Sequence, residues 1–269
     1  MKKLLSLLLV LVMMLSLTFV FSCAQDNGDG GITEPTDPKT DVAKAITKTN
    51  ELDDYKATME MNMDISMNIL GTEMSMEVPM TSNITVKNAH GDKPEIYTEI
   101  ETTIMEQTTT AQTYCDGTWQ YTYDGEEGYK VEVDEAQDYI ESLEETLKNI
   151  PADLLEGLSF EKVENGYKVS VQIPDDKFAE LFDEIIDGAT ESLGEEMDVT
   201  ISNAVVDIII NSSFYIVEYD MEFDMVMEMD MSGMTVEANA HAVVNTTIHN
   251  PGQDVTITPM EGYQDYPEL

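Results

Sequence analysis

The sequence contains no arginine: all thirteen basic residues are lysines, and they stand against 54 aspartates and glutamates. The formal net charge is −41. A surface this acidic repels phosphate backbones, which argues against nucleic-acid binding. Without arginine, the chain also lacks the bidentate clamp that commonly holds phosphate and carboxylate groups. Phosphoryl transfer is therefore not expected.

Residues that commonly carry catalysis or bind metals are also scarce. The chain has two cysteines, Cys23 and Cys115, and three histidines. No G-x-S-x-G elbow, P-loop or H-E-x-x-H zinc motif is present. Cys115 comes at the end of a strand pattern, where we expect a half-buried thiol of the core. We expect no enzyme, no metal site and no cofactor.

The amino terminus has the features of a processing segment. Lys2 and Lys3 precede an uncharged run over residues 4–21, and Val20-Phe21-Ser22-Cys23 resembles a bacterial lipobox, although Phe21 is larger than is common there. We expect residues 1–22 to be a lipoprotein signal peptide and Cys23 to carry the lipid. The protein would then be extracytoplasmic and held at the cell membrane. An uncleaved membrane-spanning helix is the alternative, because the run reaches the lower length limit.

The composition changes twice along the remaining chain. Residues 23–40 are rich in Asp, Gly, Thr and Pro, which predicts a flexible polar tether. Hydrophobic residues make up 42% of the whole sequence, enough for a real core. We therefore expect residues 41–269 to form a single folded domain.

Apolar residues in this domain recur mainly with the period of a β-strand. From Tyr55 to Ile69, every odd position is apolar. Helical spacing is confined to 41–53, 136–147 and 175–186. Pro79 predicts an edge or a bulge, since proline donates no ladder hydrogen bond. The strands are expected at about 55–69, 74–80, 96–105, 108–115, 119–123, 129–133, 158–164, 167–173, 199–210, 214–231 and 234–249.

The segment from Tyr215 to Met231 shows the alternation most clearly. All nine odd positions are apolar, and six of the seven even positions from 218 to 230 are acidic. One face of this strand must be dry and the other wet, as in an antiparallel sheet with one buried face. The predicted fold class is α+β, with a curved antiparallel sheet and helices on its apolar side.

Methionine is concentrated in two strand pairs. Seven of the nineteen methionines lie between Met59 and Met80, and six between Met221 and Met234. Methionine makes deformable walls around ligands, and Ala238, Ala240 and Ala242 on the last strand leave further room. A sheet about 45 Å wide is also wider than the roughly 30 Å that three helices cover. The candidate residues of a ligand cavity are Met59, Met61, Met63, Met67, Met74, Met76, Met221, Phe223, Met225, Met227, Met229 and Met231.

Periodicity alone leaves other interpretations open. An ordinary packed core explains the apolar stripes as well as a lipid cavity does. Thioethers could bind Cu⁺, and the carboxylates at 218–230 could collect Ca²⁺. A structural or interaction module at the cell surface is a further alternative.

Several features together resemble the LolA-like superfamily of lipoprotein carriers, in particular its LppX and LprG type lipoproteins and uncharacterised Gram-positive lipoproteins. They are the lipobox, the tether, the helix over 41–53, the Met-rich strand pairs, the Tyr114 to Trp119 stretch and the closing Ile257-Thr258-Pro259. The resemblance implies a half-open β-barrel of about 9–11 strands with helices packed on its concave face. It also implies a carrier or sensor of lipidic ligands.

Overall fold

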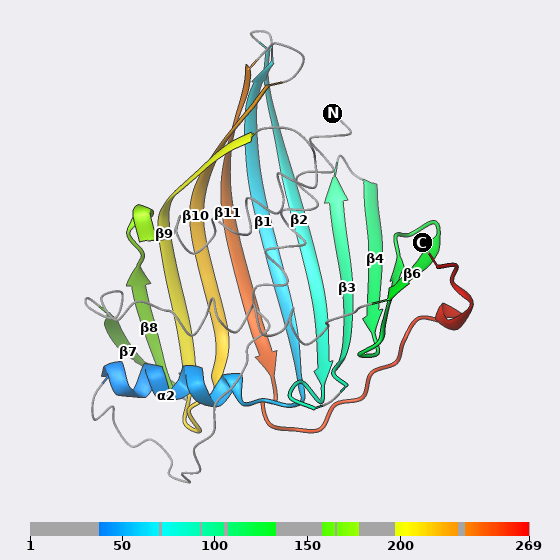
Figure 1. Cartoon of the computed structure of the whole chain (residues 1–269). Helices are drawn as coiled ribbons and strands as arrows, with labels where there is room; N and C mark the ends of the chain where they lie inside the picture. Colours follow the sequence, from blue (N-terminus) through cyan, green and yellow to red (C-terminus); the bar gives the residue numbers. More distant parts are fainter. Residues whose placement is uncertain are drawn as a thin grey trace.

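The computed structural model describes residues 38–69, 72–91, 93–104, 107–132, 158–164, 166–177, 197–230 and 235–268. The expected signal peptide, Cys23 and most of the tether lie outside these ranges. Eleven antiparallel strands form one curved sheet (Figure 1). The strand order is β6-β5-β4-β3-β2-β1-β11-β10-β9-β8-β7. Among the described residues, β6 and β7 are the two edges and do not pair with each other, so the sheet is an open half-barrel.

The strand positions follow the predicted alternation closely, and β2 extends seven residues beyond the expected Met80. The bounds are β1 Tyr55–Ile69, β2 Thr72–Lys87, β3 Glu95–Ile104, β4 Gln107–Cys115, β5 Trp119–Tyr123, β6 Gly128–Glu132, β7 Ser159–Val163, β8 Gly166–Gln172, β9 Met197–Asn211, β10 Ile216–Asp230 and β11 Thr235–His249.

The described chain is mostly β, and its helices are α2, Pro38–Asn50, the 3₁₀ helix η1, Tyr263–Asp265, and one helical turn at 175–177. The predicted helix over 41–53 corresponds to α2 and begins three residues earlier, at a proline suited to the first turn. The helix predicted over 136–147 lies outside the described residues, as does that over 175–186 after its first turn. The expected α+β arrangement with helices across the concave face is therefore seen only in part.

Helix α2 packs at one end of the sheet, across β8, β9 and β10 (Figure 1). Asp41 lies in its first turn and Lys48 in its last, as the helix dipole favours. Val42, Ala45 and Thr49 form a buried stripe at helical spacing. Val42 and Ala45 join the main core of the sheet.

Pro79 lies where one side of β2 loses its partner. The β2–β3 ladder ends at Met80 opposite Thr102, while β1 continues to pair with β2 as far as Thr72. Within the described residues, the part of β2 before Met80 is thus an edge on the β3 side. A proline is tolerated there because no N–H is needed. The edge predicted from Pro79 is confirmed.

The two faces of the sheet differ as the alternation predicts. The odd positions of β1 from Tyr55 to Met67 are all buried, and all six of its even positions from 58 to 68 carry polar side chains that are exposed or partly so. On β10, Glu218, Glu222 and Glu228 are exposed. Much of the acidic charge therefore lies on the outward face, which places the apolar side chains on the inward face.

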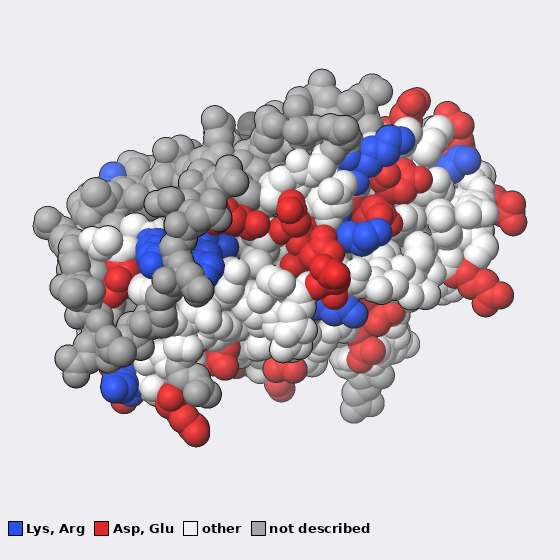
Figure 2. Space-filling view, turned by 90° about the horizontal axis from the view of Figure 1, so that it is seen from below, with Lys and Arg blue, Asp and Glu red and all other residues white. Residues whose placement is uncertain are grey.

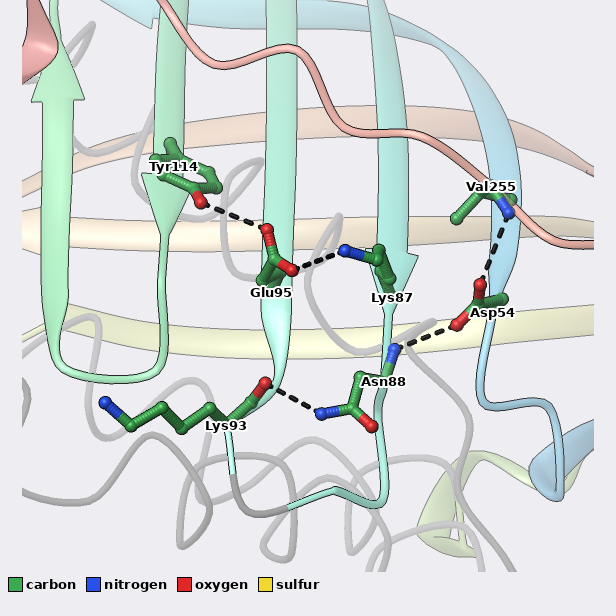
Figure 3. A network of polar contacts seen from close by, with 7 residues as sticks. All are labelled: Asp54, Lys87, Asn88, Lys93, Glu95, Tyr114 and Val255. Carbon is green, nitrogen blue, oxygen red and sulfur yellow. Dashed lines mark hydrogen bonds and ion pairs between the residues drawn. The ribbon is translucent and has the colours of Figure 1, made fainter.

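Polar contacts on the outward face join three chain segments at the α2 end of the sheet (Figure 3). Asp54, just before β1, accepts hydrogen bonds from the backbone N–H groups of Asn88, at 2.9 Å, and Val255, at 3.3 Å. Beside it, Glu95 pairs with Lys87 at 2.7 Å and accepts a hydrogen bond from Tyr114 at 3.2 Å. These contacts fasten the carboxyl-terminal segment to the β2–β3 turn.

The carboxyl-terminal segment, residues 250–268, crosses the outward face of the sheet and ends beside β6 (Figure 1). Met260 is buried there with Tyr114 and Tyr121 in a small separate cluster. The N–H of Lys130 donates to the carbonyl of Pro267 at 2.9 Å, which covers part of the β6 edge. The alternation did not predict this second core, because it lies on the polar face.

Candidate functional site

Strand β11 lies between β10, which precedes it directly in the chain, and β1, which is far from it in sequence, so the three strands share one inward face. Residues paired across a ladder project to the same side. Three inward positions of β11 are alanines, and each has a larger side chain opposite it on both neighbouring strands. The sets are Met63–Ala242–Phe223, Ile65–Ala240–Met225 and Met67–Ala238–Met227. We call Ala238, Ala240 and Ala242 the alanine row.

The structure brings most of the predicted cavity residues to this face. Eight of them are at most 4% exposed and belong to one apolar cluster: Met59, Met61, Met63, Met67, Met221, Phe223, Met225 and Met227. Met74 and Met76 of β2 are partly buried against the same cluster. Met229 pairs in β10 with Met197 and Val236, but its side chain lies outside the description, as does all of Met231.

A β-bulge shapes the β10 side of this face. The β9–β10 register shifts between Glu222 and Asp224, and Asn203 of β9 has a φ of 57°. Such an extra residue bends a strand and increases its local twist. Phe223, the largest side chain beside the alanine row, lies at this bend.

A row of hydroxyl groups lies on the same inward face, nearer to α2. Ser82 of β2 and Thr246 of β11 pair with Met59 from its two sides, and Tyr219 of β10 pairs with Thr246. We call Ser82, Thr246 and Tyr219 the hydroxyl row. Burial raises the pKa of the Tyr219 phenol, which therefore stays protonated at neutral pH.

Two members of the hydroxyl row are buried without a partner. Ser82 is 0% exposed and Thr246 is 2% exposed. Among the described residues, neither Ser82 Oγ nor Thr246 Oγ1 has a hydrogen-bond partner. The sequence reasoning missed both. The available signal was a polar residue at an inward position of an apolar alternation, between Met80 and Ile84 on β2 and between Val244 and Ile248 on β11.

Polar side chains on the outward face form their own network. His241 Nδ1 lies 2.8 Å from Asp224 Oδ1, and Asn203 donates to Asp224 Oδ2 at 2.8 Å. Hydrogen bonds from His241 and then Asn203 hold the pKa of Asp224 below its ordinary value. Across the described ranges, no group of three or more His, Cys, Asp or Glu side chains is arranged to hold a metal ion.

Charge at the α2 end of the molecule is mixed. Seen from that end, lysines lie beside aspartates and glutamates and make no continuous basic surface among the described residues in view (Figure 2). Lys48 is engaged with the Ser213 carbonyl at 2.8 Å, and Lys44 lies over the Phe214 ring. In the part of the chain that the structure describes, no helix has the length and apolar character to cross a membrane.

Three solved structures resemble this chain at low sequence identity. LprF from Mycobacterium bovis shares 15% identity over 82% of this chain and 95% of its own, with a TM-score of 0.38. A LolA superfamily protein from Nitrosomonas europaea shares 9% over 82% and 96%, with a TM-score of 0.21. A DUF1329 family protein from Desulfovibrio piger shares 10% over 83% and 96%, with a TM-score of 0.23.

Likeness at this level assigns no ligand and no residue role to this chain. None of the curated proteins matches it. The model of a family of unknown function, DUF6612, matches residues 39–261, and the chain therefore belongs to that family.

Proposed function

We propose that this protein is a lipid-anchored extracytoplasmic binding protein, not an enzyme, that holds a lipid or another apolar molecule against the inward face of its sheet. Its role is that of a carrier or a sensor. The site consists of the alanine row and the methionines beside it. Cys23 carries the anchor, and the segment up to Pro38 links the anchor to the folded domain.

The observation that carries this proposal is the contrast in side-chain size across β11. Small side chains occupy three successive inward positions, and larger ones, four of the six being methionines, stand on both sides of them. A well-packed core alternates large and small residues across facing layers. A continuous row of alanines flanked mainly by methionines is instead suited to a binding groove whose walls adjust to a ligand.

Burial of an alkyl chain in such a site favours binding. Each methylene removed from water contributes about 0.8 kcal/mol. Ten buried methylenes therefore contribute about 8 kcal/mol, which corresponds to a dissociation constant near 1 μM before the cost of association is subtracted. An alkyl chain of ordinary lipid length supplies this without any charged contact.

The tether has the reach that an anchored binding domain needs. Fourteen residues separate Cys23 from Pro38. A fully extended chain of that length spans about 48 Å. The domain can therefore approach the membrane surface or stand clear of it while the anchor stays in place.

The test uses the mature chain with Cys23→Ser, which removes the anchor. Native mass spectrometry detects any lipid that co-purifies with this chain. Titration with the uncharged probe N-phenyl-1-naphthylamine measures the affinity of the site for an apolar molecule. Ala240→Leu adds about three carbon atoms to the alanine row and should weaken probe binding at least about tenfold. Asn239→Leu, one residue away on the exposed outward face, is the matched control.

Folding of each variant is checked by circular dichroism before binding is compared. If Ala240→Leu does not fold, Ala240→Val adds less bulk at the same position and takes its place. The proposal fails if the wild-type chain carries no lipid and binds no probe, or if bulk at Ala240 leaves probe binding unchanged. Failure of that kind favours the competing function, a structural or interaction module whose inward face is only a core.

A further inference from the structure

The hydroxyl row and the alanine row occupy one face in a fixed order. From the strand tips toward α2, the inward positions of β11 are Ala238, Ala240, Ala242, Val244 and Thr246. Ser82 lies two strands away from Thr246, at the same level across Met59. The two hydroxyls therefore stand beyond the end of the alanine row, separated from it by one apolar layer that contains Val244.

Both hydroxyls lie in surroundings that suit apolar side chains. The nearest inward-facing residues on the same two strands are all buried and apolar: Met80 and Ile84 on β2, and Val244 and Ile248 on β11. A buried hydroxyl without a hydrogen-bond partner destabilises a fold relative to an apolar residue of similar shape. Two such groups at one level of one face point to a partner that the described chain does not itself supply.

We propose that the ligand is an uncharged amphiphile, with its alkyl chain along the alanine row and an ester or hydroxyl group hydrogen-bonded to Ser82 and Thr246. This inference rests on the function proposed above and adds the chemical class of the ligand. Hydroxyl groups both donate and accept, so they pair with ester carbonyls and with alcohols equally well.

Among the described residues of the strands that carry the two rows, no lysine lies on the inward face, which favours an uncharged polar group. The four strands that carry the two rows, β1, β2, β10 and β11, have two lysines among their described residues, Lys56 and Lys87. Lys87 is paired with Glu95 on the outward face, and Lys56 has the outward parity of β1. A carboxylate or phosphate buried at Ser82 and Thr246 would lack a counter-charge, which is strongly unfavourable.

The dimensions of the face agree with this arrangement. The seven residues of β11 from Ala238 to Val244 span about 20 Å. One leaflet of a bilayer core, and hence one lipid chain within it, measures about 15 Å. An alkyl chain that starts at the hydroxyl row thus ends within the alanine row, before the strand tips.

The experiment compares two probes with the same chain and different polar groups, 1-monooleoylglycerol and oleate, at a pH where oleate is ionised. The mature chain with Cys23→Ser is titrated with each. Wild type should bind monooleoylglycerol at least about tenfold more tightly than oleate, because only the glycerol ester is uncharged. The variant Ser82→Ala/Thr246→Val should lose about tenfold in affinity for monooleoylglycerol.

A matched control and a third probe separate the possible outcomes. Thr81→Ala/Thr247→Val removes the neighbouring hydroxyls on the outward face of the same two strands and should bind like wild type. N-phenyl-1-naphthylamine should bind wild type and the hydroxyl variant equally. The inferred ligand class is wrong, and the apolar site stands, if this probe binds both proteins equally while two further results hold. These are that wild type binds monooleoylglycerol and oleate equally, and that the two double variants bind monooleoylglycerol equally. If N-phenyl-1-naphthylamine binds neither wild type nor the variants, the proposed function fails, and the inference with it.

Discussion

The side-chain hydroxyl of Thr49 accepts a hydrogen bond of 2.8 Å from the backbone N–H of Ile216, 167 residues away in the chain. Thr49 lies in the last turn of α2 and Ile216 begins β10, and both are 1% exposed. This contact supplies a partner for a backbone donor at the end of a strand. It therefore sets where α2 packs on the sheet.

Thr49→Val should lower the free energy of unfolding by about 1–3 kcal/mol, because it leaves the Ile216 N–H buried and unpaired while it keeps the side-chain shape. Urea denaturation of the mature domain measures this. Thr47→Val on the exposed side of the same helix is the control and should change stability by less than about 0.5 kcal/mol. Equal effects of the two substitutions would show that the hydrogen bond has no role.

The strands of this protein could be predicted well because most of them are half-buried. A strand with one wet face alternates strictly, and the alternation from Tyr215 to Met231 gives both its extent and its inward side. The helix predicted over 136–147 and most of that predicted over 175–186 lie outside the described residues. The second core around Met260 escaped prediction because Tyr114 and Tyr121, on the polar face, carry no periodic signal that distinguishes a covered tyrosine from an exposed one.

The candidate site could be predicted only in part, for a different reason. The inward methionines follow from each strand alone, and ten of the twelve candidate residues have described side chains on the expected face. Strand order is a long-range property, however: β10 and β11 are consecutive, but nothing local indicates that β11 pairs with β1 on its other side. Without that order, Ser82 and Thr246, 164 residues apart, cannot be recognised as one level of one site.

The hydrogen bonds to Asp224 make part of the stability depend on pH. Because the pKa of Asp224 in the folded protein is lowered, the folded state binds fewer protons than the unfolded state near that pKa. The stabilisation is present above the ordinary aspartate value of about 3.9 and is lost as the pH falls through the lowered pKa.

Asp224→Asn should therefore be less stable than wild type at about pH 5 and approach wild-type stability as the pH falls through the lowered pKa. Urea midpoints measured across this range provide the comparison. A difference between the two proteins that stays constant with pH would mean that the charge on Asp224 does not matter. His241→Gln keeps a side-chain hydrogen-bond donor at this position and should reduce, but not abolish, the pH dependence.

Cys115 should be chemically inert in the folded protein. The residue is 8% exposed, and burial raises the pKa of its thiol. Since the thiolate is the reactive form, alkylation by iodoacetamide at about pH 8 should be at least about tenfold slower in the native Cys23→Ser chain than in concentrated urea. Mass spectrometry follows the reaction. Equal rates in the two states would contradict the burial of this thiol.

Tyr263 joins the carboxyl-terminal segment to the sheet. Its ring meets those of Tyr114 and Tyr121 edge to face, with centroid distances of 5.2 Å and 4.7 Å. Tyr263→Ala should lower the free energy of unfolding by about 1–3 kcal/mol, because two aromatic contacts and the burial of the ring are lost. Tyr263→Phe keeps the ring and should change stability by less than about 0.5 kcal/mol.

Loss of the Tyr263 contacts should also affect association between molecules. The segment that follows covers part of the β6 edge through the bond from the Lys130 N–H to the Pro267 carbonyl. An uncovered edge strand is a template for pairing with another chain. Light scattering should therefore detect concentration-dependent association for Tyr263→Ala and none for Tyr263→Phe. If Tyr263→Ala stays monomeric at the concentrations where it remains folded, the segment stabilises the fold without protecting its edge.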